Sequence, residues 1–69
     1  MEAIIEYNAA LRLKPDDAEA HNNLGNAYVK RNRFDEAVNE FMTALELKPD
    51  FAEAHNNLQF CYGMKTIKR

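Results

Sequence analysis

Apolar residues recur at the spacing of an amphipathic helix in four separate stretches of the chain. No stretch alternates apolar and polar residues for long enough to indicate a strand. Asn32 tolerates a left-handed backbone and is expected to turn the chain after the second helix, and Gly63 is expected to fray the fourth. The pattern predicts an all-α fold whose helices cover residues of about 2–14, 18–31, 35–48 and from 52 onward.

Prolines and aspartates mark the ends of these predicted helices. Pro15 and Pro49 disfavour helical geometry in the preceding residue, so they end the first and third helices. The aspartates that follow can cap the next helices, because their side-chain oxygens accept hydrogen bonds from free backbone N–H groups: Asp16, Asp17 and Asp50. The connections are short, so consecutive helices are expected to pack antiparallel.

The chain repeats itself at an offset of 34 residues. The segment Ala18–Leu24 returns unchanged as Ala52–Leu58, and Leu13–Asp16 returns as Leu47–Asp50. Of the 27 residue pairs from 2/36 to 28/62, 17 are identical, whereas the seven pairs that follow share nothing. A fixed period of this length indicates a helical repeat array, in which each unit buries its apolar face against its neighbours.

Several positions of the repeat form a spaced motif: His21-x-x-Leu24-Gly25-x-x-Tyr28, Ala37-x-x-x-Phe41 and Pro49. This motif resembles that of the tetratricopeptide repeat family, whose units are pairs of helices named A and B. The family usually has tryptophan at the first position, where this chain has His21. The resemblance implies a fragment of an α-solenoid with the following repeat core: Leu24, Gly25, Tyr28, Ala37, Phe41, Ala44 and Pro49.

The resemblance also implies a single domain with an unusual helix order, which begins with a B helix and ends with an A helix. Residues 1–15 correspond to a B helix, residues 16–51 to a complete repeat, and residues 52–69 to an A helix with a basic tail. The fourth helix of one copy is therefore expected to complete a repeat with the first helix of another, as a ring, a filament or a reciprocal exchange. The predicted function is a scaffold or protein-interaction module that forms homo-oligomers. The alternative explanation of this helix order is that the chain is an excerpt from a longer array.

In this family the A helices line a groove that holds an extended peptide. The resemblance places Asn23 and Asn57 one repeat apart in this groove, like the asparagine ladder of the O-linked N-acetylglucosamine transferases. An asparagine side chain both donates and accepts, so it suits a peptide backbone. Peptide binding by a fragment of a longer superhelix is thus the alternative function. The candidate groove residues are Asn22, Asn23, Asn26, Lys30, Asn56, Asn57 and Phe60.

A basic clamp for a C-terminal carboxylate, as in chaperone-binding members of the family, is disfavoured. Asn22 stands at the position of a clamp lysine, and Glu53 would repel a carboxylate. The remaining interpretation of these polar positions is that they are solvated surface residues.

Composition and charge narrow the classes of function. The net charge of −2 and a pI near 5.6 favour neither nucleic acid nor an anionic membrane as a partner. Cys61 is the only cysteine, which excludes an intramolecular disulfide. No apolar run reaches the length of about 20 residues that spans a bilayer, and no secretory signal is evident, so a cytoplasmic location is expected.

The sequence contains no motif for catalysis or for metal binding. His21 and His55 are 34 residues apart, which is no ligand spacing, and packing between A and B helices is their expected role. No cofactor and no enzymatic activity are predicted. The basic residues at the end of the chain are interpreted as solvated: Lys65, Lys68 and Arg69.

Overall fold

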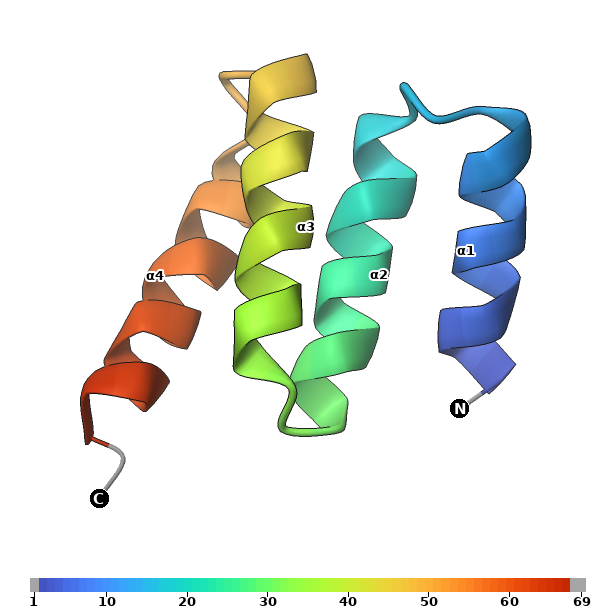
Figure 1. Ribbon diagram of the computed structural model, residues 1–69. Helices are drawn as coiled ribbons and strands as arrows, with labels where there is room; N and C mark the ends of the chain where they lie inside the picture. Colours follow the sequence, from blue (N-terminus) through green and yellow to red (C-terminus); the bar gives the residue numbers. More distant parts are fainter. Residues whose placement is uncertain (1, 68–69) are drawn as a thin grey trace.

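The computed structural model describes the backbone of residues 2–67 and the side chains of residues 3–65. Within these residues it contains helices and no strand, which confirms the predicted all-α fold. Figure 1 shows the helices side by side in chain order, alternately up and down. In addition to its neighbours in this order, α2 contacts α4. The helices are α1 (Glu2–Leu13), α2 (Ala18–Lys30), α3 (Phe34–Leu47) and α4 (Ala52–Ile67).

The predicted helix ends are accurate to within a residue, except at α4. Asn32 has a φ of 60°, as expected for the turn between α2 and α3. The fraying predicted at Gly63 is wrong, because α4 continues through this residue to Ile67. A single glycine weakens a helix by about 1 kcal/mol relative to alanine but keeps its backbone hydrogen bond. Lys68 and Arg69 of the predicted basic tail lie outside the described residues.

The two A-type helices, α2 and α4, begin differently. Asp17 caps α2, since its carboxylate accepts from the backbone N–H of Ala20 at 3.1 Å. In α4 the corresponding position is held by Phe51, whose carbonyl accepts from the N–H of His55. The cap predicted at Asp50 is therefore wrong, because this aspartate lies one residue too early.

The core consists of two clusters on either side of α2. Tyr28 packs against both, so it joins the two halves of the array. The first cluster lies between α1 and α2 and is formed by Ile4, Leu11 and Leu24. The second lies between α2, α3 and α4 and is formed by Ala37, Val38, Phe41 and Cys61.

Gly25 lets α3 approach α2 closely. A Cβ atom at this position would lie 2.5 Å from the ring carbon Cε1 of Phe41, which is well inside van der Waals contact. Phe41 has no exposed surface, so its ring cannot move aside without disturbing the core. The glycine of the repeat motif is thus required by the packing of an aromatic ring on a helix backbone.

Candidate protein-interaction surface

The same helical face is buried in α3 and uncovered in α1. Ala37, Phe41 and Ala44 are all 0% exposed, because α3 is packed between α2 and α4 and the ring of Phe41 lies on Gly25 of α2. One repeat earlier, Ala3 and Ala10 are exposed and Tyr7 is only half-buried. We call these three residues the α1 face. It is a helix-packing surface that the described helices leave largely uncovered.

The outer side of α4 is uncovered in a similar way. Leu58 is half-buried and Tyr62 is 47% exposed, whereas Leu24, the repeat equivalent of Leu58, is 1% exposed. α4 differs from α2 at a position that matters for packing, because it has Gln59 where α2 has Gly25. Figure 1 places α1 and α4 at opposite edges of the array, so the two surfaces are separate.

Asn22, a candidate groove residue, lines a hollow between the starts of α2 and α4 but is almost completely enclosed. Its side chain is 1% exposed, and its Oδ1 accepts a hydrogen bond from Nδ2 of Asn57 at 3.1 Å. The side chain is enclosed because α2 and α4 are neighbours on this side of the array. The buried amide is thereby satisfied, as such groups must be. Asn22 therefore joins adjacent A-type helices.

The other candidate groove residues remain at the surface to different degrees. Two shallow hollows lie on this side, and Asn23 lines both. One, of about 240 Å³, lies between the starts of α2 and α4, and the other, of about 270 Å³, extends to Ala3 and Tyr7 on the α1 face. The half-buried candidates are Asn26 and Asn57. The exposed candidates are Asn23, Lys30, Asn56 and Phe60.

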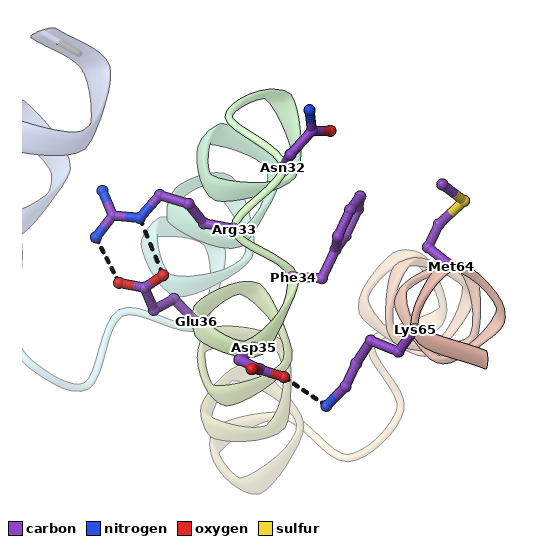
Figure 2. Close-up of a pocket in the computed structure, with 7 residues that line it drawn as sticks. All are labelled: Asn32, Arg33, Phe34, Asp35, Glu36, Met64 and Lys65. Carbon is purple, nitrogen blue, oxygen red and sulfur yellow. Dashed lines mark hydrogen bonds and ion pairs between the residues drawn. The ribbon is translucent and has the colours of Figure 1, made fainter. Parts of the chain in front are cut away.

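A third hollow, of about 500 Å³, lies where the turn before α3 faces the end of α4. Figure 2 shows its charged groups in pairs. Nε of Arg33 donates to Glu36 at 2.9 Å, and Nζ of Lys65 lies 2.6 Å from Oδ1 of Asp35. These hydrogen bonds raise the pKa of both Arg33 and Lys65. The charges of this hollow are paired with one another, and the exposed pair of Lys65 and Asp35 joins the end of α4 to the start of α3.

The two histidines hold the A-type helices to the turns that precede them. Nε2 of His21 lies 2.8 Å from the carbonyl oxygen of Pro15, and Nε2 of His55 lies 3.0 Å from that of Pro49. His21 has a second contact, since its Nδ1 lies 2.7 Å from Oε1 of Glu40 in α3. Sequence reasoning anticipated packing at this interface but missed the carboxylate partner, which lies 19 residues away.

The second contact predicts unequal effects of truncating the two histidines. We expect His21→Ala to lower the free energy of unfolding by about 1–2 kcal/mol, because it removes a partly buried charged hydrogen bond as well as the tie to the turn. His55→Ala removes only the tie at an exposed site and is expected to cost about 0.5 kcal/mol. Urea denaturation followed by circular dichroism, at a protein concentration that excludes association, measures both. Equal losses would contradict a role for Glu40.

Cys61 is a packing residue. It is fully buried in the cluster around Phe41 and takes the place that Ala27 has in α2. Burial raises the pKa of its thiol, and the positive charge of Lys65 opposes the rise. A protonated, enclosed thiol is a poor nucleophile.

These features define a helical-repeat protein whose contacts are made by helix surfaces. A family model described as TPR repeat matches residues 1–31 and again residues 25–64. The chain therefore belongs to the tetratricopeptide repeat family, whose repeats generally mediate protein–protein interaction. None of the curated proteins matches the chain. Among the described residues, no helix is long and apolar enough to cross a membrane, and no group of three or more possible metal ligands occurs.

Proposed function

We propose that this chain is a non-enzymatic protein-interaction module that associates with further copies of itself, the α1 face of one copy docking on α4 of the next. The observation that carries the proposal is the contrast between two copies of one helix face. In α3 this face is completely buried between the A-type helices α2 and α4, whereas in α1, which packs only on α2 among the described helices, it is largely uncovered. Burial of such a face against a matching helix is the main source of stability in repeat arrays.

The A-type helix α4 is a suitable occupant of the α1 face. Its first seven residues, Ala52–Leu58, are identical to Ala18–Leu24 of α2, the helix that covers the corresponding face of α3. The contact joins two different surfaces, so it repeats from copy to copy and yields a ring or a filament. A reciprocal exchange between two copies uses the same contact twice.

Gln59 sets the strength of this association. In the internal contact, the ring of Phe41 lies on Gly25, where even a methyl group would be too close. In the contact between copies, Tyr7 would meet Gln59 instead. Tyr7 is only half-buried and can tilt away from the glutamine, at the expense of close packing. Association between copies is therefore expected to be weaker than the internal packing of α3 on α2.

Light scattering coupled to size-exclusion chromatography tests the proposal over a range of concentrations. We expect the mean mass to rise with concentration above that of the 8.0 kDa chain. Ala10→Arg places a charge on the α1 face and should weaken association at least tenfold. Ala9→Arg, at an exposed neighbouring position on another side of α1, is the matched control and should have little effect. A constant mass of one chain at all concentrations would reject the proposal.

Binding of an extended peptide along α2 and α4 is the second candidate function. It is favoured by the two adjoining hollows that meet at Asn23. The groove would differ from a simple asparagine ladder, because one donor of Asn57 is already bonded to Asn22. Peptide binding of this kind requires no association between copies, so Ala10→Arg separates the two candidates.

A further inference from the structure

We infer that copies of the chain associate in one defined register, in which Glu6 of one copy forms an ion pair with His55 of the next. The inference rests on the proposed self-association and specifies its geometry. Its template is the internal pair of His21 and Glu40, whose Nδ1 and Oε1 atoms lie 2.7 Å apart. This pair joins an A-type helix to the B-type helix that follows it.

The 34-residue period predicts an equivalent pair in the contact between two copies. His55 is the repeat equivalent of His21 on α4, and Glu6 is the repeat equivalent of Glu40 on α1. If α1 of a second copy lies on α4 as α3 lies on α2, Glu6 meets His55 in the same way.

His55 is already oriented for this partner. Its Nε2 atom is held by the carbonyl oxygen of Pro49, as Nε2 of His21 is held by that of Pro15. In His21 this arrangement directs Nδ1 to Glu40, so in His55 it leaves Nδ1 at the corresponding place on the outer side of α4. The side chains of His55 and Glu6 are both exposed, and neither has an ion pair with another described residue.

A second internal contact leads independently to the same register. Asn22 of α2 is bonded to Asn57 of α4, which is the next A-type helix. The same period sets Asn56 of one copy against Asn23 of the next, and both are exposed here. Glu6 and Asn23 are separated along the chain by the same distance as Glu40 and Asn57. A second copy therefore presents the carboxylate and the amide in the required arrangement.

Charge reversal tests the direct contact. Glu6→Lys places an ammonium group opposite His55, and His55→Glu places a second carboxylate opposite Glu6. Each substitution is expected to raise the dissociation constant of association about fivefold to tenfold at low salt. A chain that carries both substitutions should regain association to within about threefold of the original. Glu46→Lys changes an exposed charge of α3 and serves as the control that should not respond.

Mixing the two single variants gives the sharpest result. In the mixture, the reversed charge of one variant faces the reversed charge of the other across one contact, so the mixture should associate more strongly than either variant alone. Sedimentation velocity of the separate and mixed samples measures this. Single variants that associate like the original chain, or a mixture and a double variant without rescue, would overturn the register and leave the self-association standing. A monomeric original chain would reject both.

Discussion

Replacing Phe41 with alanine is expected to lower the free energy of unfolding by about 3–5 kcal/mol, which is a large part of the stability of so small a domain. The ring is fully buried and lies directly on the backbone of Gly25. Its removal leaves a cavity between α2 and α3 that neither backbone can close, because the helices are held apart by the rest of their contact. Denaturation by urea, followed by circular dichroism, measures the loss.

Tyr7→Ala is the matched control for this experiment. Tyr7 is the repeat equivalent of Phe41 and packs only partly against Ile4, Leu11 and Leu24. Its truncation in the unassociated chain is expected to cost about 1–2 kcal/mol, because part of the side chain is already in contact with water. Similar losses for the two substitutions would contradict the assignment of the α1 face as an uncovered copy of the buried face of α3.

Replacing Gln59 with glycine is expected to strengthen self-association by one to two powers of ten. The side chain of Gln59 stands where the ring of Tyr7 from a second copy would lie, as the ring of Phe41 lies on Gly25. Overpacking of this kind costs about 1–3 kcal/mol, and each 1.4 kcal/mol changes a dissociation constant about tenfold. Sedimentation velocity over a range of concentrations gives the dissociation constants.

Gln59→Ala separates the effect of space from the effect of side-chain chemistry. Alanine removes the amide but keeps Cβ, which at Gly25 would be the atom that meets the ring. We expect Gln59→Ala to associate much like the original chain. Glycine also weakens helix α4 by about 1 kcal/mol relative to alanine, so helicity must be compared at the same time. Equal dissociation constants for the glycine and alanine variants would show that Gln59 does not limit docking.

The helices and their turns could be predicted because their signals are local. The periodic apolar positions, Pro15 and Pro49 at the helix ends, and Asn32 in the left-handed turn all act within a few residues. The errors have local causes too. Gly63 does not interrupt α4, and Asp50 misses the cap position by one residue. The role of Gly25 was recognised only as a motif position, and its contact with Phe41 required the structure.

The groove was harder to predict, because surface exposure depends on neighbouring helices. Asn22, Asn23 and Asn26 all belong to one short segment of α2, and their spacing does not reveal which of them is enclosed by α4. The structure buries Asn22 against Asn57 and leaves Asn23 exposed. The partner of Asn22 lies 35 residues away in the chain, which is beyond any local pattern.

The 34-residue repeat, the four helices and the family were determined by the sequence alone, since helix signals and spaced motifs are properties of neighbouring residues. Only the tertiary structure decided which copy of each repeated residue is buried. The identical segments Ala18–Leu24 and Ala52–Leu58 show this most clearly: Asn22 is enclosed and Asn56 exposed, whereas Ala20 is half-buried and Ala54 enclosed. The physical reason is that burial depends on the helices packed around a residue, and these differ between the middle and the edge of the array.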